Sequence, residues 1–393
     1  MAEESVVSFP QKKFKLLTWN IWFDIRDREE RMAALIEYIL KEQPDVVCLQ
    51  EVVPAVKTFL SECSSGMAQS ILDGSNKVEI GQKQSNKASK FGRGLLDGFK
   101  NLSRPSSHRS ESNDQNTDIN KLTKATKLTD HYVFSDNEIK IYGLLTLVKK
   151  QGRGRDGHSV DITNAKFDYQ DFSESSMDRG LLQAILNVEI NIEAESESLN
   201  KSESTTNINV ADKHKKKCRN FELVVATSHL ESLHNQNTRE FQIKETAERL
   251  KDYPMAVFCG DFNFDSTKSY GDWVKRPPME LENIVLQKEM PDFIDSWAFL
   301  THRNDASEGY CTKVLEDDVD PGYTFDGFSY PRYIKDVDER MRYDRVMAKG
   351  LIPKSIEVVG KEQICLFPKT KAMTTRKIRI SDHFGLLTEF ELQ

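Results

Sequence analysis

The sequence predicts a mixed α/β domain, and three observations support this fold class. Apolar segments typical of strands recur along most of the 393-residue chain, and segments with helical spacing of apolar residues lie between them. The chain also opens on a strand, a helix and a second strand within residues 14–49. Alternation of this kind is characteristic of domains in which helices cover the faces of sheets.

The first three elements follow from the apolar pattern. Residues 14–19 and 45–49 are almost continuously apolar, as expected of strands that are buried on both faces. Between them, residues 28–43 have helical periodicity, and Pro44 ends the helix because its ring cannot continue the hydrogen-bonding pattern. The apolar side chains on one face of this helix are Met32, Leu35, Ile36, Ile39 and Leu40.

Later segments repeat the same two patterns. The helix with the clearest spacing covers residues 236–252 and is followed by Pro254. The segments expected to form strands are 139–148, 181–190, 221–228, 255–259, 343–348 and 384–391. The chain shows no internal repeat and no heptad pattern, which favours one globular domain over a solenoid or a coiled coil.

Two segments differ in composition and are expected to be disordered insertions, at 74–130 and 191–217. The first is rich in Ser, Asn, Lys and Gly, and residues 81–130 contain ten Lys or Arg against five Asp or Glu. The second begins with acidic residues and ends in a basic cluster at residues 213–217. Such a cluster is compatible with nuclear import, with a nucleic-acid contact or with a solvated loop.

Composition limits the class of protein. The net charge of −7 does not by itself indicate nucleic-acid binding. The acidic start of the chain does not resemble a signal peptide, and no apolar run approaches the ~18 residues of a membrane span. We therefore expect an intracellular protein, in the nucleus and cytoplasm, with a short flexible tail over residues 1–13 and one domain over residues 14–393.

The six cysteines do not predict a zinc site or a disulfide framework. They are far apart and form no CxxC pair. Their positions are Cys48, Cys63, Cys218, Cys259, Cys311 and Cys365. Cys48 and Cys259 lie inside apolar segments, where a thiol usually serves as a small core side chain.

Polar residues stand repeatedly at the ends of the predicted strands. They are Asn20, Gln50 and Glu51, Ser228 and His229, Asp261 and Asn263, Asp344, and Ser381, Asp382 and His383. Taken singly, an Asn after a strand is usually a turn residue, and a lone His is usually a satisfied core residue. Six such positions in one chain indicate a functional site, because sites in α/β folds gather at strand ends.

These residue types suit the hydrolysis of a phosphodiester with Mg²⁺, or Mn²⁺ as a substitute. Carboxylate and amide oxygens favour Mg²⁺ over Zn²⁺. Asp261 and Asn263 are two residues apart, so on an extended segment they face the same side, where one can accept a proton from water and the other can donate to phosphate. His229 and His383 can donate to phosphate oxygens when protonated, and a carboxylate such as Asp344 can keep one of them charged.

The order of these motifs resembles the endonuclease/exonuclease/phosphatase superfamily, which includes deoxyribonucleases, apurinic endonucleases, inositol phosphatases and neutral sphingomyelinases. The resemblance covers roughly residues 14–392 apart from the two insertions, and it is strongest to the tyrosyl-DNA phosphodiesterase 2 subfamily. The segments that carry the subfamily resemblance are 228–232 with 239–242, 295–300 with 323–326, and 177–182.

The resemblance implies a fold and a metal site. The fold is a four-layer α/β sandwich, in which two β-sheets pack face to face and are flanked by helices, and residues 14–393 form the catalytic domain. Glu51 is implied as the principal magnesium ligand, with Asn20 beside it. Asp382 is implied to assist the metal or the neighbouring His383.

The resemblance also implies catalytic roles. Asp261 corresponds to the residue that orients and deprotonates water. Asn263, His229 and His383 correspond to donors to the phosphate in the transition state, and Asp344 corresponds to the residue that orients His383.

The implied substrate is a 5′-phosphotyrosyl bond that joins DNA to a peptide of trapped topoisomerase II, so the implied function is DNA repair. Arg179, Tyr142 and Phe325 correspond to substrate-binding positions, although Phe325 stands where the subfamily often has Trp. The expected partner is DNA with a 5′-linked tyrosyl peptide, and we expect the protein to act as a monomer away from membranes.

Other functions share the same residues. A phosphodiesterase for lipids or inositol phosphates, and an endonuclease for abasic DNA, would use the same catalytic core. A binding module without catalysis is the alternative from another class, and it would lack metal or water-activating residues that this sequence retains.

Overall fold

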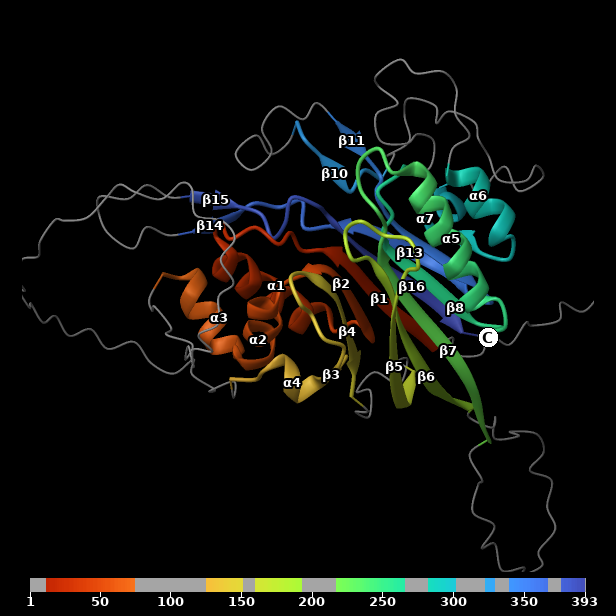
Figure 1. Cartoon of the computed structure of the whole chain (residues 1–393). Coiled ribbons are helices and arrows are strands. Elements are labelled where there is room, and N and C mark those ends of the chain that lie inside the picture. Colours follow the sequence, from red (N-terminus) through yellow and green to blue (C-terminus); the bar gives the residue numbers. More distant parts are fainter. Residues whose placement is uncertain are drawn as a thin grey trace, which may run out of the picture.

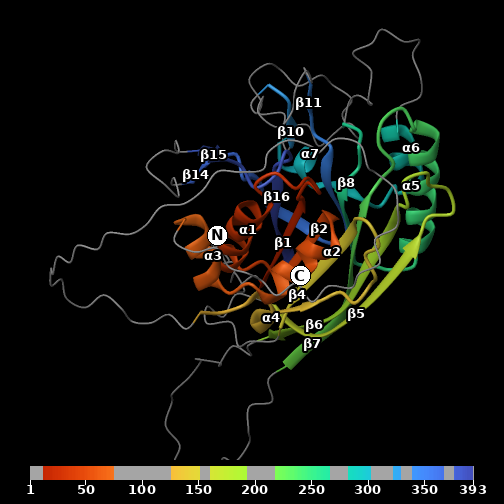
Figure 2. The ribbon, with the colours of Figure 1, turned by 60° about the vertical axis from the view of Figure 1, so that its left-hand side comes forward.

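The computed structural model of the chain describes residues 12–74, 125–150, 160–192, 217–265, 282–301, 322–328, 339–366 and 376–392. These residues form a four-layer sandwich in which two mixed sheets pack face to face between two groups of helices (Figures 1 and 2). The four-layer α/β sandwich expected from the sequence is thereby confirmed. No helix in the described ranges is both long and apolar enough to cross a membrane.

The first sheet has six strands among the described residues. In spatial order they are β13 (Ile352–Val359), β16 (Gly385–Leu392), β1 (Lys12–Asn20), β2 (Val46–Val52), β4 (Gly143–Lys149) and β3 (Tyr132–Phe134). β1 and β2 are parallel and are connected through helix α1 (Arg28–Glu42), so the predicted strand, helix and strand at the start of the chain are confirmed.

The second sheet also has six strands in the described part of the chain. In spatial order they are β5 (Asp161–Asp171), β6 (Gly180–Ile192), β7 (Lys217–His229), β8 (Ala256–Asp261), β12 (Asp344–Lys349) and β9 (Ile294–Asp295). β7 and β8 are parallel, and helix α5 (Gln236–Leu250) connects them. Two short hairpins accompany the sheets, β10 (Phe325–Asp326) with β11 (Arg340–Met341) and β14 (Ile364–Leu366) with β15 (Arg376–Ile378).

The helices cover the outer faces of both sheets. α1, α2 (Pro54–Glu62), α3 (Ser65–Leu72) and α4 (Leu128–His131) lie against the first sheet (Figures 1 and 2). α5 and α6 (Glu282–Glu289) lie against the second sheet, and α7 (Ser296–Thr301) packs near β12 and β13.

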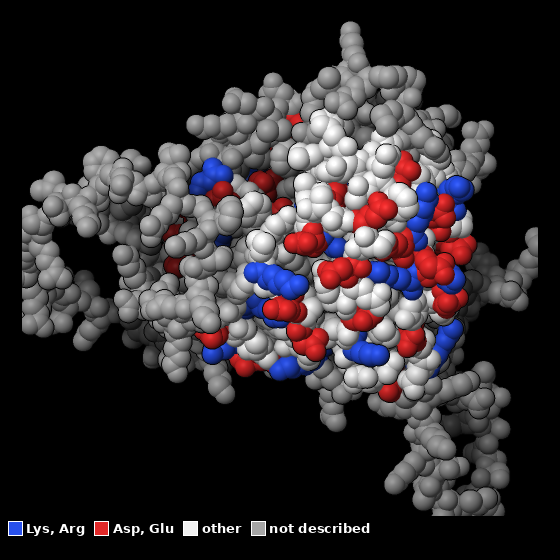
Figure 3. Space-filling model, viewed as in Figure 1, with Lys and Arg blue, Asp and Glu red and all other residues white. Residues whose placement is uncertain are grey.

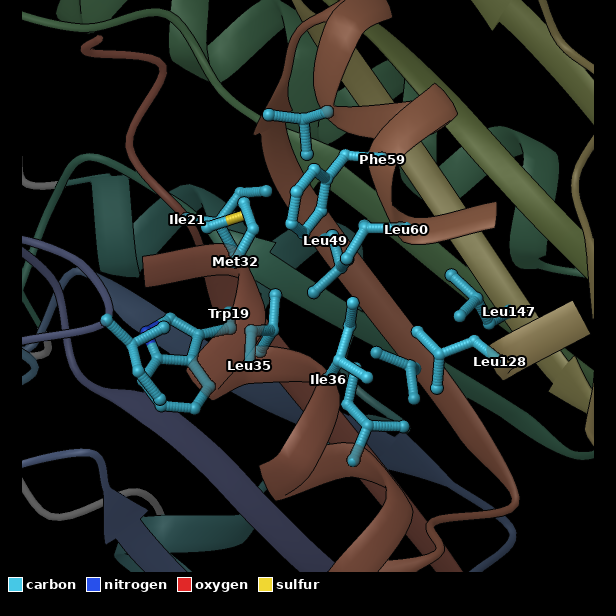
Figure 4. Close-up of a cluster of buried hydrophobic side chains, with 14 of the residues drawn as sticks. Trp19, Ile21, Met32, Leu35, Ile36, Leu49, Phe59, Leu60, Leu128 and Leu147 are labelled. Carbon is cyan, nitrogen blue, oxygen red and sulfur yellow. The ribbon is translucent and has the colours of Figure 1, made fainter. Parts of the chain in front are cut away.

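Three apolar layers hold the sandwich together, and the alternation of side chains along the strands produces them. On β7, Leu223 and Val225 point into the layer between the sheets, whereas Val224 and Ala226 point toward α5 and α6. The third layer lies between the first sheet and α1 to α3, where Trp19 of β1 packs near Leu35 of α1 (Figure 4). Because β7 buries both faces at residues 223–226, its sequence is continuously apolar there.

Some elements differ from the sequence prediction. The strand expected at 139–148 begins only at Gly143, and Ile141 before it is 70% exposed. β5 was not predicted, because its polar residues and half-exposed face hide the apolar alternation. The helices α2 and α3 were also not predicted, since each spans too few residues to show a sustained period.

The expected tail and insertions lie largely outside the described residues, which omit 1–11, 75–124 and 193–216. The ordered fold extends further toward both insertions than expected. Residues 125–131 include α4, whose Leu128 is buried in the core, and β6 and β7 continue to Ile192 and from Lys217.

Candidate active site

Strand ends from both sheets meet at one place, and their register brings the predicted polar residues together. Asn20 pairs with Gln50 at the ends of β1 and β2. Asp261, at the end of β8, pairs with His229 of β7 on one side and with Asp344 of β12 on the other. The carboxyl ends of parallel strands lie at one edge of a sheet, which explains why distant motifs converge.

One buried side chain, that of Gln50, connects the two sheets next to these strand ends. The Gln50 side chain is buried, and its Nε2 donates to Thr18 Oγ1 at 3.1 Å in the first sheet and to Thr227 Oγ1 at 3.0 Å in the second. Buried polar groups are retained when they are hydrogen-bonded, so this bridge fixes the separation of the sheets beneath the site.

Asp261 is the centre of the site and is 1% exposed. Its Oδ2 accepts from Asn20 Nδ2 at 2.9 Å, and its Oδ1 accepts from the backbone N–H of Asn263 at 2.9 Å. The Nε2 atoms of His229 and His383 lie 3.4 and 3.9 Å from Oδ2. Burial alone would raise the pKa of Asp261, but the two imidazoles and the hydrogen bonds outweigh it and lower that pKa.

His383 is paired with Asp344, as the sequence predicted. The distance from His383 Nδ1 to Asp344 Oδ2 is 2.8 Å. Burial alone would lower the pKa of His383, but the carboxylates of Asp344 and Asp261 raise it well above its ordinary value. His383 is therefore a charged donor at neutral pH, and Asp344 fixes which ring nitrogen faces Asp261.

His229 has a different environment from the one expected for a charged donor. Burial, and then the positive charge of Arg179, lower the pKa of His229 well below its ordinary value. Arg179 Nη1 lies 2.7 Å from His229 Nδ1, and a guanidinium can only donate. His229 is therefore neutral, with Nδ1 as acceptor and the ring proton on Nε2, toward Asp261.

Asn263 is held by the backbone. Its φ of 56° lies in the left-handed region, which Asn tolerates better than most residues. Its Nδ2 donates to the carbonyl of Leu230 at 2.9 Å. The amide group is thereby fixed beside Asp261, and its second N–H hydrogen remains for an oxygen of a ligand.

Glu51 and Asp382 form the acidic side of the site. Glu51 stands in an irregular part of β2, with a φ of 60°, and its Oε2 accepts from the backbone N–H of Phe23 at 3.0 Å. Burial, and then the negative charge of Asp382, raise the pKa of Glu51 to about 7. Burial likewise raises the pKa of Asp382.

This donor set fits a hard divalent cation. Two carboxylates that repel each other in a buried setting gain free energy when a cation lies between them, and the amide of Asn20 adds a further oxygen nearby. A second group, Asp261, Asp344 and His383, has ligand atoms within 4.8 Å of one another. In that group His383 is paired with Asp344 and protonated, and a protonated imidazole cannot bind a metal, so a cation fits better on the side of Glu51 and Asp382.

Tyr142 and Arg179, the two residues expected to bind substrate, lie together next to His229. The Arg179 guanidinium carbon is 5.1 Å from the centre of the Tyr142 ring, and Phe23 stacks on the same ring at 5.5 Å. Both Tyr142 and Arg179 line a pocket of about 550 Å³. Phe23, which is 49% exposed, was missed by the sequence analysis although it follows the Asn20 motif directly.

Phe325 lies elsewhere. Its ring centre is 5.2 Å from that of His383 and 5.8 Å from that of Tyr343, and its backbone forms an isolated bridge with His383. Phe325 therefore packs on the catalytic histidine rather than beside Tyr142.

Charges on the surface around the fold are mixed. Figure 3 shows Lys and Arg side chains interspersed with Asp and Glu on the visible face. That face therefore gives no single-sign field that would attract an anionic substrate over a distance.

Comparisons with known proteins agree with this geometry. The model of the Endonuclease/Exonuclease/phosphatase family matches residues 17–383. D. rerio TDP2 complexed with single-strand DNA product is similar in structure, with a TM-score of 0.53 at 17% identity over 97% of this chain and 99% of that chain. Truncated Caenorhabditis elegans TDP2 gives a TM-score of 0.50 at 17% identity over 97% and 98%. No curated protein sequence matches the chain significantly.

At this identity the two TDP2 structures bear on the fold alone, which they share with the chain over nearly its whole length. The family model matches residues 17–383, a span from β1 to His383 that contains the strand ends described above. The chain therefore belongs to the endonuclease/exonuclease/phosphatase family of phosphodiesterases and phosphatases.

Proposed function

We propose that the protein is a divalent-metal-dependent phosphodiesterase that hydrolyses the 5′-phosphotyrosyl bond between DNA and trapped topoisomerase II, and thereby acts in DNA repair. The observation that carries the proposal is the arrangement around Asp261. A buried carboxylate is held by Asn20 and Asn263, with the Nε2 atoms of His229 and His383 within 4 Å.

Asp261 would orient and deprotonate the attacking water. Its pKa is below the ordinary value, so it is a carboxylate at neutral pH and can accept a proton. His383 carries a positive charge next to it and would donate to a phosphate oxygen as negative charge develops. Asn263 would donate from its free amide hydrogen on the same side.

Glu51 and Asp382, with Asn20 beside them, would hold Mg²⁺ or Mn²⁺. When bound, such a cation polarises the phosphoryl oxygens and stabilises the charge of the leaving group. The fit rests on the position of Glu51, held by the backbone N–H of Phe23, beside Asp382; burial, and then the charge of Asp382, raise the pKa of Glu51.

The proposed substrate rests on Arg179 and Tyr142. Arg179 is 6% exposed, and its Nε is a buried donor with no hydrogen-bond partner among the described residues, as expected of a group that awaits an anion. The ring of Phe23, which is 49% exposed and stacks on Tyr142, offers a flat apolar face for a nucleobase or a tyrosyl ring. The similarity of fold to a TDP2 bound to a single-strand DNA product supports DNA as the ligand.

An isotope experiment tests the proposed reaction. The protein is incubated with Mg²⁺ and a 5′-phosphotyrosyl oligonucleotide in H₂¹⁸O, and both products are analysed by mass spectrometry. Attack of water on phosphorus places ¹⁸O in the 5′-phosphate and releases unlabelled tyrosine. The absence of cleavage, or a label in tyrosine, would contradict the proposal, and the Asp261→Asn variant controls for contaminating nucleases.

A further inference from the structure

A turn before β6 carries Arg179 and is organised by Ser175. The Ser175 hydroxyl oxygen accepts the backbone N–H of Arg179 at 2.9 Å and that of Met177 at 3.2 Å. The same hydroxyl donates its single hydrogen to Glu231 Oε2 at 2.7 Å. Ser175 therefore connects the carboxylate of Glu231 to the backbone of Arg179.

Glu231 is a buried carboxylate two residues after His229, and both of its carboxylate oxygens accept hydrogen bonds. It is 0% exposed, and it also accepts from the backbone N–H of Ser176 at 2.9 Å and from Gln242 Nε2 at 3.2 Å. Its own backbone N–H donates to Gln242 Oε1 at 2.8 Å. A buried charge with this many donors holds its neighbours in one arrangement, because losing any of them leaves a desolvated group unsatisfied.

The position of Arg179 decides the state of His229. Arg179 Nη1 meets His229 Nδ1 at 2.7 Å, and only an unprotonated Nδ1 can accept from it. The ring proton must then be on Nε2, which lies 3.4 Å from Asp261 Oδ2. If Arg179 moved away, the Nε2-protonated tautomer would no longer be imposed, because the remaining neighbour of Nδ1 is Glu51 Oε1 at 3.9 Å, an acceptor that favours a proton on Nδ1.

We propose that Glu231 and Ser175 are positioning residues that fix Arg179 and, through it, the Nε2-protonated tautomer of His229. The alternative is that Glu231 only joins α5 to the turn and stabilises the fold, without an effect on the tautomer of His229. The effect of the two residues on catalysis rests on the proposed function, whereas their effect on His229 does not.

Two variants interrupt the connection, and a third is a matched control. Ser175→Ala removes the hydroxyl while leaving Ser176 and Gln242 on Glu231. Glu231→Gln replaces one of the two carboxylate oxygens with a donor, so the donors on one side, Ser175 and Gln242 or Ser176, lose their acceptor. Ser173→Ala is the control, because Ser173 lies in the same segment but contacts the partly exposed side chain of Glu245.

The tautomer is read by ¹⁵N NMR of imidazole-labelled protein without substrate. We expect the Nε2-protonated form of His229 in the wild type and in Ser173→Ala, and a mixture of tautomers in Ser175→Ala and Glu231→Gln. Unchanged His229 resonances in both variants would overturn the proposal, whatever the substrate of the protein is.

Kinetics with a 5′-phosphotyrosyl oligonucleotide give the second readout. We expect kcat to fall about 10–100-fold in Ser175→Ala, as for other residues that orient a catalytic ligand, and to be unchanged in Ser173→Ala. In an Arg179→Ala background, Ser175→Ala should cost no more than about twofold, because the residue through which it acts is gone. Equal losses with and without Arg179 would show that Ser175 supports only the fold. A wild type that is inactive on this substrate contradicts the proposed function and leaves the NMR result to decide the positioning role.

Discussion

The side chains of Asn20 and Asp261 hydrogen-bond at 2.9 Å, although 241 positions separate them in the chain. Asn20 ends β1 in the first sheet and Asp261 ends β8 in the second. The first sheet also supplies Glu51, whereas the second supplies His229. The site therefore exists only when the sheets are packed face to face, and each sheet alone carries half of it.

Asp261→Asn should lower kcat at least ~100-fold, because removal of a general base typically costs ~10²–10⁴. The amide has the same shape, so the circular dichroism spectrum should be unchanged. Asp73→Asn, at the exposed end of α3, is the control and should keep wild-type kcat. A folded Asp261→Asn protein with near-normal turnover would show that another group activates water.

Removal of divalent cations should abolish activity. Glu51, Asp382 and Asn20 offer oxygen atoms, and these favour Mg²⁺ or Mn²⁺ over Zn²⁺. After dialysis against EDTA, addition of Mg²⁺ or Mn²⁺ should restore turnover and Zn²⁺ should not. Glu51→Gln should raise the Mg²⁺ concentration that gives half-maximal activity. Full turnover in EDTA is the contradictory outcome.

Tyr142→Ala should reduce kcat/KM for a 5′-phosphotyrosyl oligonucleotide. The loss should correspond to about 1–3 kcal/mol of transition-state stabilisation, the range for a lost stack of a base on an aromatic ring. A small aryl phosphodiester should lose much less, because the groups around Asp261 stay in place. Phe325→Ala should behave differently and reduce turnover of both substrates, since its ring packs on His383. If both variants lost the same fraction of kcat/KM on each of the two substrates, the separate roles of Tyr142 and Phe325 would be contradicted.

The sequence alone was sufficient to identify the polar residues that stand at strand ends. Asn20, Glu51, Asp261 and His383 each stand beside a continuously apolar segment, and a buried strand gives such a segment a recognisable end. The four-layer arrangement, by contrast, came from the resemblance of the motifs, because periodicity does not specify which strands pair.

Contacts made by loops could not be predicted in this way. Arg179 reaches His229 through a turn in which Asp178 has a φ of 53°, and no periodic pattern records that geometry. The position of Phe325 was also missed, because β10 has only two residues and its contact with His383 is an isolated bridge. Such contacts depend on tertiary packing rather than on local preference.

Asp295→Asn should destabilise the fold by about 3–5 kcal/mol, the usual cost of breaking a buried ion pair. Asp295 is 2% exposed and accepts from both Arg342 and Arg345, at 2.9 and 2.7 Å for the shortest contacts. Glu389→Gln is the control, since the pair of Glu389 with the exposed Lys13 should be worth less than about 1 kcal/mol. Urea unfolding at pH 7 measures both values.

The difference in unfolding free energy between wild type and Asp295→Asn should become smaller at low pH. Burial alone would raise the pKa of Asp295, but the two guanidinium groups outweigh it and depress that pKa well below its ordinary value. A carboxyl with a depressed pKa stabilises the folded protein above the pKa of the unfolded chain, ~3.9, and loses this effect as pH falls further. The difference between wild type and Asp295→Asn should therefore be constant from pH 5 to 7 and shrink below about pH 4. A difference that grows on acidification would contradict the role of the ion pair.

The most direct test of the central claim is a side-by-side measurement of kcat/KM on four substrates with Mg²⁺. These are a 5′-phosphotyrosyl single-stranded oligonucleotide, a duplex with an abasic site, sphingomyelin in micelles and an inositol phosphate. We predict cleavage of the first substrate at the protein–DNA bond, with kcat/KM at least ~100-fold above the other three, and loss of this activity in Asp261→Asn. Preferred cleavage of any of the other three by the same folded protein would contradict the assignment as a tyrosyl-DNA phosphodiesterase.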